Sequence, residues 1–148
     1  MLLSVSTIAF ALGCMTALAW CARLPVVGTI GRVRFFFVVI LATGAYLIEA
    51  GGAAAGVSSL LLAVSTASIS FFLTMALVLR CQDLGIGMYA GGLLMFLPGG
   101  LLIPAIFRGN PDPQRRLPRS PFADGLPAIM ISLAILLLAS SYALTLRP

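Results

Sequence analysis

The sequence predicts an all-α membrane protein, a polytopic helical bundle of four to five transmembrane helices in a single domain over residues 1–148. The first observation is composition, because 61% of the 148 residues are apolar and 9% are charged, whereas a soluble domain has about 25% charged residues. The second is a series of long apolar runs, since a helix of ~20 residues is needed to cross ~30 Å of hydrocarbon. The third is the missing alternation of a membrane β-barrel, which leaves the helix as the structure that satisfies its own backbone in lipid.

The apolar runs are predicted to be helices joined by short polar segments. The first run carries no basic residue ahead of it and exceeds the ~7–15 apolar residues of a signal peptide, so we expect it to remain as a helix. Its segment Ala11-Leu12-Gly13-Cys14 resembles a lipoprotein cleavage box, which is the alternative. The runs are 2–22, 35–56, 57–79, 84–107 and 126–146.

Run 84–107 differs from the others because Leu97-Pro98-Gly99-Gly100 interrupts it. Arginines cluster in the joint 23–34 and in the basic, proline-rich loop 108–125. If the fourth run enters the membrane and returns near Pro98, all arginine-rich joints lie in the cytoplasm, as the positive-inside rule requires. We therefore favour a broken or re-entrant segment near Pro98, and a fifth full span is the alternative.

The charged residues exclude several classes of site. The chain has no histidine, and nine basic residues against four acidic ones give a net charge of +5. The missing histidine excludes a His-ligated haem, a His-held zinc ion and a Ser-His-Asp triad. Cys14, Cys21 and Cys81 form no C-x-x-C pair, so no redox or metal motif is predicted. We expect no catalytic residue, no metal site, no cofactor and no enzymatic activity.

Glu49 is the one acidic side chain inside an apolar run. It lies ~21 Å along a helix that begins at Phe35, which places it near the outer end of that helix. A carboxylate at headgroup level is the favoured interpretation. The alternatives are a protonatable ion or proton site between helices, because buried carboxylates in membranes mark such paths, and a salt bridge to a partner chain.

Small and hydroxyl-bearing residues predict where helices pack. Thr66, Ser70 and Thr74 recur every four residues on the third run, where their hydroxyls favour a packing seam over a lined polar path. Two further pairs have the small-xxx-small spacing that permits close helix approach. These pairs are Gly52 with Gly56 and Gly87 with Gly91.

The loop 108–125 is predicted to be an extended connector, because proline fixes φ and removes a backbone donor. Beside an anionic leaflet each arginine gains about 1 kcal/mol, so we expect contact with lipid headgroups or an acidic partner, or else a solvated loop that sets the topology. Nucleic-acid binding is not predicted, because no aromatic residues alternate with the arginines. The arginines of this loop are Arg108, Arg115, Arg116 and Arg119.

Three joints between the runs carry motifs of one known family. Gly31-Arg32-Val33-Arg34-Phe35-Phe36 is similar to its G-R-x-S-R-x-x-[FYW] opening, without the serine. Arg80-Cys81-Gln82-Asp83-Leu84-Gly85 is similar to its R-R-L-H-D-x-G joint, with Gln82 in the place of the histidine. Gly109-Asn110-Pro111-Asp112-Pro113 resembles its closing segment. Residues 30–113 thus resemble the YhaH-like family of small bacterial inner-membrane proteins of unknown function, which implies that membrane and a cytoplasmic position for the first two joints.

These features predict a non-catalytic accessory or structural subunit that packs against a larger membrane complex or against itself, with anionic lipid headgroups as further contacts. The reason is that almost no ionisable group remains for chemistry, whereas small-residue seams for packing are frequent. The alternative is a small ion, proton or solute transport component that uses Glu49 and the hydroxyl stripe of the third helix.

Overall fold

The structure is a computed structural model that describes residues 2–23, 29–54, 56–97, 99–108, 131, 132 and 135. Within these ranges the chain forms helices joined by turns and no strand, so the predicted all-α class is confirmed. The final run, 126–146, falls outside this part of the chain apart from three helical positions. Three of the predicted spans are present as helices long and apolar enough to cross a membrane. They are α1 (Leu2–Arg23), α2 (Arg32–Ala54) and α3 (Ser59–Asp83).

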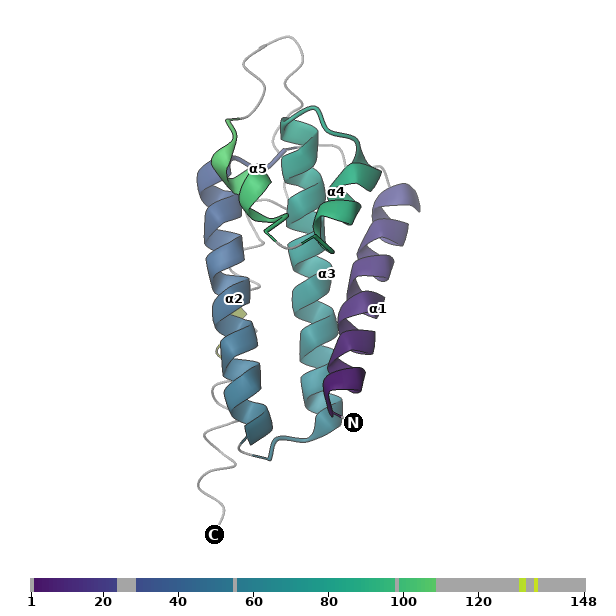
Figure 1. Cartoon of the computed structure of the whole chain (residues 1–148), viewed down its shortest axis with the longest axis vertical. Coiled ribbons are helices and arrows are strands. Elements are labelled where there is room, and N and C mark those ends of the chain that lie inside the picture. Colours follow the sequence, from purple (N-terminus) through teal and green to yellow (C-terminus); the bar gives the residue numbers. More distant parts are fainter. Residues whose placement is uncertain are drawn as a thin grey trace.

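Helix α3 is the centre of the fold. The backbones of α1 and α2 each pack against α3 but do not approach each other, and Figure 1 shows α3 between them. Accordingly, 61% of the apolar stretch of α3 is buried, against 28% in α1 and in α2. Since lipid tails are as apolar as a leucine side chain, close packing rather than escape from water holds these helices together. The core includes Ala17 and Cys21 of α1, Phe35 and Val38 of α2, and Ile69, Leu73 and Leu77 of α3.

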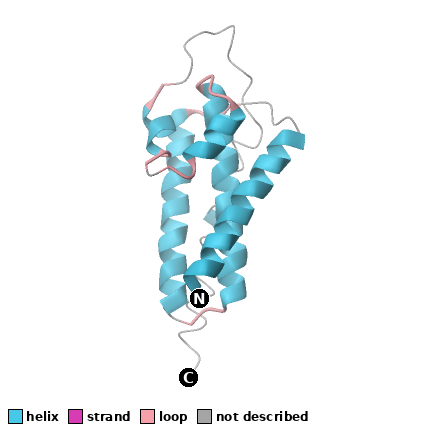
Figure 2. Cartoon of the chain, turned by 45° about the vertical axis from the view of Figure 1, so that its right-hand side comes forward, coloured by secondary structure: helices cyan, strands magenta, loops and turns pink. Residues whose placement is uncertain are grey.

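Helix α1 crosses α3 at close range through a row of small residues. Ala9, Gly13 and Ala17 recur every four residues, and all three are buried. A Cβ atom at Gly13 would overlap Ser70 Oγ and the backbone oxygen of Ala67, so glycine is what lets the two helices come this close. Figure 2 shows α1 inclined across the other long helices. This seam has small-xxx-small spacing, and it involves other residues than the glycine pairs predicted from the sequence.

Residues 84–107 form two short helices rather than one long one, namely α4 (Met88–Leu94) and α5 (Leu102–Ile106). At 1.5 Å per residue, the 7 residues of α4 extend ~10 Å, far less than the ~30 Å of a bilayer core. Figure 1 shows both short helices beside the C-terminal end of α3. The interruption predicted near Pro98 is therefore present, and this run does not cross the membrane as a single helix.

Two glycines make the reversal between α4 and α5 possible. Gly99 has a φ of +73°, a left-handed conformation that residues with a side chain rarely adopt. A Cβ atom at Gly100 would overlap the backbone oxygen of Leu94, at the end of α4. The dipeptide is thus required for its backbone geometry, as its position beside Pro98 in the sequence indicates.

Every arginine in the described ranges lies at one end of the bundle. Arg23 closes α1, Arg32 and Arg34 begin α2, Arg80 lies in the last turn of α3, and Arg108 follows α5. In Figure 1 this end is uppermost, and the N-terminus and the turn from α2 to α3 lie at the opposite end. The positive-inside rule predicts that the arginine-bearing end faces the cytoplasm.

Candidate functional site

Glu49 is buried inside the bundle, since 8% of its surface is exposed. Its two carboxylate oxygens accept hydrogen bonds from α3: Oε1 accepts one from the Ser65 hydroxyl, and Oε2 accepts one from Thr66 Oγ1 at 2.9 Å. Thr66 also donates to the backbone oxygen of Leu62 at 2.8 Å. Glu49 lies ~8 Å along α2 from Ala54, so it is near that end of the helix, as the sequence predicts. The side chain turns into the bundle, where hydroxyls of α3 bind it, and the headgroup-level position stays a prediction.

A tight turn between α2 and α3 brings these residues together. Gly56 has a φ of +82°, and the backbone N–H of Val57 donates to the oxygen of Gly52 at 3.0 Å, which closes the turn. The Ser58 hydroxyl then accepts from the N–H of Leu61 and caps the start of α3. The chain therefore returns antiparallel, and the third turn of α3 lies opposite the penultimate turn of α2.

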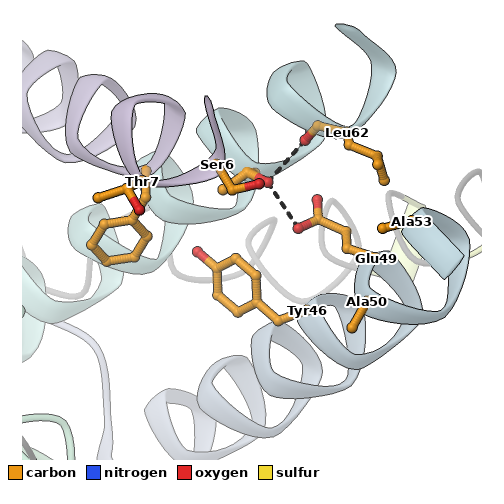
Figure 3. A pocket seen from close by; sticks show the side chains of 9 residues that line it. Ser6, Thr7, Tyr46, Glu49, Ala50, Ala53 and Leu62 are labelled. Carbon is orange, nitrogen blue, oxygen red and sulfur yellow. Dashed lines mark hydrogen bonds between the residues drawn. The ribbon is translucent and has the colours of Figure 1, made fainter. Parts of the chain in front are cut away.

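Glu49 lines a pocket of about 380 Å³. In Figure 3 its carboxylate points toward α3, and the dashed lines mark the hydrogen bonds that Thr66 donates to Glu49 and to Leu62. The pocket is open rather than enclosed, and residues of α1, α2 and α3 line it. Its lining residues are Ser6, Thr7 and Phe10 of α1, Tyr46, Glu49, Ala50 and Ala53 of α2, and Leu62 and Thr66 of α3.

Aromatic rings form one wall of this pocket. The rings of Phe10 and Tyr46 face each other with centroids 6.4 Å apart and planes inclined by 51°. Phe10 also packs edge-on against Phe96, with centroids 6.3 Å apart. The Tyr46 hydroxyl oxygen is itself buried. Phe10 and Tyr46 both belong to the lining of the pocket.

Within the described ranges no cationic side chain pairs with Glu49. The ion pair seen there joins Arg80 to Asp83, at the far end of α3. Arg23, Arg32 and Arg34 also lie at that far end. Among the described residues the pocket therefore combines one carboxylate, several hydroxyls and an apolar wall, and no positive charge.

The three hydroxyls of the predicted stripe do not act alike. Thr66 reaches the pocket, whereas Ser70 and Thr74 are fully buried. Ser70 donates to the backbone oxygen of Ala67 at 3.0 Å, and Thr74 donates to that of Ser70 at 2.7 Å. Such bonds to the preceding turn satisfy the hydroxyls within their own helix. Ser70 lies against Gly13 of α1, so this part of the stripe packs between two helices and does not line a polar path.

The predicted glycine pairs have four different surroundings. A Cβ at Gly91 would lie 3.0 Å from Cys81 Sγ, so α4 approaches α3 closely there. A Cβ at Gly52 would lie 3.3 Å from a methyl group of Val57, within the turn. No described atom lies within 4 Å of a Cβ at Gly56 or at Gly87, so the packing roles predicted for these two residues stay predictions. Gly56 supplies the positive φ of the turn, and Gly87 precedes α4 as its N-cap.

A second polar cluster surrounds Arg80, whose side chain is 1% exposed. Nε donates to the backbone oxygen of Pro104 at 2.9 Å, and Nη2 donates to that of Phe107. Nη1 donates to the oxygen of Ile30 at 3.5 Å and pairs with the Asp83 carboxylate. One guanidinium thus joins the end of α3, the end of α5 and the segment before α2, and every one of its nitrogens is occupied by these bonds.

The arginines predicted to contact anionic lipid headgroups are only partly described. Arg108 is exposed just beyond α5, at the arginine-bearing end of the bundle. Arg115, Arg116 and Arg119 lie outside the described residues. Lipid or partner contact by this loop stays a prediction.

Several residues around Glu49 were not singled out from the sequence. Ser65 is adjacent to Thr66, and its role depends on the rotation of α3, which residue spacing does not specify. Phe10 and Tyr46 lie in different apolar runs, and the sequence does not show that their rings come into contact. One pattern in the sequence could have indicated this site. Hydroxyl residues near the start of α1 and Glu49 near the end of α2 both lie at the end of the bundle away from the arginines.

No protein family, curated protein or solved structure matches this chain. The similarity to the YhaH-like family stays a resemblance carried by its short motifs.

Proposed function

We propose that this chain is a small membrane transport component that binds a cation or another polar solute at Glu49. The observation that carries the proposal is a buried carboxylate that lines an open pocket between helices long enough to cross a membrane. A carboxylate within hydrocarbon is costly, and membrane proteins keep one mainly where it binds or moves charge. Ser65 and Thr66 hold both oxygens in place, which keeps the binding group preorganised.

The pocket suits a solute that enters from the side away from the arginines. Glu49 lies ~8 Å from the α2 end opposite to Arg32, and the positive-inside rule assigns that end to the outer face. The resemblance to the YhaH-like family supports a bacterial inner membrane as the location. The proposal gives Glu49 and Thr66 the binding step and gives no role to Ser70 and Thr74, which bond to their own helix.

The proposal is tested by flux through liposomes that contain only this protein. Glu49→Gln is expected to abolish a proton or cation flux that Glu49→Asp retains, because the amide has the shape of the carboxylate but not its charge. Flux is measured with an internal pH dye and with an internal potassium dye. Thr43→Val, on the exposed side of α2, is the matched control and is expected to leave the flux unchanged. Equal flux in wild type, Glu49→Gln and Glu49→Asp would contradict the proposal.

An accessory or structural subunit is the second candidate function, and the outer face of α2 supports it. Five large apolar side chains of α2 are about half exposed or more, and the steps from 33 to 36, 37 to 40 and 40 to 47 keep most of them on one side of the helix. They are Val33, Phe36, Phe37, Ile40 and Leu47. Such a row of large apolar side chains fits a neighbouring helix as well as lipid. It extends for most of the length of α2, on the side that α3 leaves uncovered.

For this second candidate, purification in a mild detergent is expected to show co-migration with a larger membrane assembly. Ile40→Trp is expected to release the chain from that assembly, because the larger ring disturbs the contact face. Val64→Trp, an equally exposed position on α3, is the matched control and should leave co-migration intact. A chain that migrates alone in all three forms would remove this candidate.

A further inference from the structure

We infer that the Glu49 pocket binds a monovalent organic ammonium ion with an apolar body, an alkyl- or arylammonium. This inference rests on the proposed binding role of Glu49 and names the class of solute. Three features meet in one cavity: a buried carboxylate, a wall of aromatic rings and an opening.

The size of the pocket favours an organic solute over a bare metal ion. A volume of about 380 Å³ lies in the range of small-molecule sites. A Ca²⁺ or Mg²⁺ site instead surrounds its ion with about six oxygen ligands at ~2.0–2.6 Å. The pocket offers one carboxylate, and the described residues contain no group of three metal-ligating side chains. Much of the remaining lining is carbon, from Phe10, Ala50, Ala53 and Leu62.

The charge of the pocket favours a solute with a single positive charge. Glu49 is the one carboxylate among the described lining residues, and it pairs with no described cation. Each oxygen accepts one hydroxyl hydrogen bond, from Ser65 or from Thr66. A carboxylate oxygen has two lone pairs, so each can accept a further N–H donor. An ammonium group therefore completes both the charge balance and the hydrogen bonding.

The aromatic wall favours an ammonium ion that carries an apolar body. The rings of Phe10 and Tyr46 lie on the same pocket as the carboxylate. Ring faces attract cations within about 6 Å, and ring edges and faces pack well against alkyl or aryl groups. A small hydrated inorganic cation uses neither surface. A cation with an attached hydrocarbon uses both.

The depth of the pocket matches the depth at which such solutes collect. An amphiphilic ammonium ion keeps its charge near the headgroups and its body in hydrocarbon, as lysine side chains do. Glu49 lies ~8 Å inside the end of α2, which is near that boundary. The pocket is open rather than enclosed, so a solute held at this depth can reach the carboxylate.

The test is equilibrium dialysis of the purified full-length protein with radiolabelled 2-phenylethylammonium. Neutral 2-phenylethanol and anionic 3-phenylpropionate serve as matched probes of the same ring and similar length. We expect wild type to bind the ammonium probe at least tenfold more tightly than either matched probe. Glu49→Gln is expected to remove this preference, and Glu49→Asp is expected to keep it.

Three ring variants test the aromatic wall. Phe10→Leu is expected to weaken binding of the ammonium probe severalfold. Tyr46→Leu is also expected to weaken binding, because it removes the second ring of the wall. Phe36→Leu, on the outer face of α2, is the matched control and should bind normally. Protection of Cys14 and Cys21 from N-ethylmaleimide shows that each variant has folded, since both thiols are buried in the wild type.

The outcomes separate this inference from the transport proposal. Equal binding of the three probes in wild type and in Glu49→Gln would overturn the inference. If Glu49-dependent proton or potassium flux is then still present, the proposed function stands without it. Binding of the ammonium probe that depends on Glu49, in a protein that carries no flux, would support the inference and contradict transport.

Discussion

Arg80→Met is expected to detach the α4–α5 hairpin, which comprises α4, α5 and the turn between them, from α3. The expected loss of stability is about 3–5 kcal/mol, the usual cost of removing one partner of a buried ion pair. Methionine keeps the apolar stem but donates no hydrogen bond. The backbone oxygens of Ile30, Pro104 and Phe107 would lose their donor, and Asp83 would lose its cation. Buried carbonyls without partners are themselves expensive, so the hairpin is expected to separate rather than remain unsatisfied.

The native Cys81 thiol reports this separation. It is fully buried, and Gly91 of α4 lies against its Sγ atom. In Arg80→Met we expect N-ethylmaleimide to label Cys81 in the folded protein while Cys14 and Cys21 stay protected, with mass spectrometry to identify the labelled site. Arg23→Met is the matched control, because Arg23 is exposed at the same end of the bundle. Protection of Cys81 in both variants would show that Arg80 does not hold the hairpin.

Gly13→Ala is expected to push α1 away from α3 and to destabilise the fold by about 1–3 kcal/mol, the usual cost of overpacking. The added methyl group overlaps Ser70 Oγ, which can rotate away, and the backbone oxygen of Ala67, which cannot. Helix propensity alone predicts the opposite sign, because alanine favours a helix over glycine by about 1 kcal/mol. The sign of the change in stability therefore shows whether Gly13 matters for the contact with α3 or only for the helix propensity of α1.

Detergent unfolding followed by circular dichroism measures this change in stability. The matched control is Gly44→Ala on α2, where no described atom lies within 4 Å of a Cβ, so propensity should act alone and the variant should gain stability. Cys14 and Cys21 should become reactive in Gly13→Ala, since both are buried and Cys21 Sγ contacts Met75 Sδ of α3 at 3.1 Å. A stabilised Gly13→Ala with both thiols protected would contradict the close approach of α1 and α3.

The break in run 84–107 shows what could be predicted along the chain. Proline restricts φ, and Gly99 supplies the positive φ of the reversal. Residues 97–100 therefore predict a turn without any knowledge of the tertiary structure. The depth of Glu49 along α2 was predictable for a similar reason, because a fixed rise per residue converts position into distance. Its burial was not, since that depends on which side of α2 faces α3.

The sequence by itself determined the helical class, the positions of three membrane-length helices and the interruption near Pro98, because these follow from composition and from local backbone geometry. The tertiary structure alone decided that Gly13 forms a close helix contact, that Glu49 meets Ser65 and Thr66, and that Arg80 joins three elements. The physical reason is that an apolar helix in lipid carries similar side chains on every side. The face that packs against a neighbour and the face that meets lipid then look alike in sequence, and only the contacts themselves distinguish them.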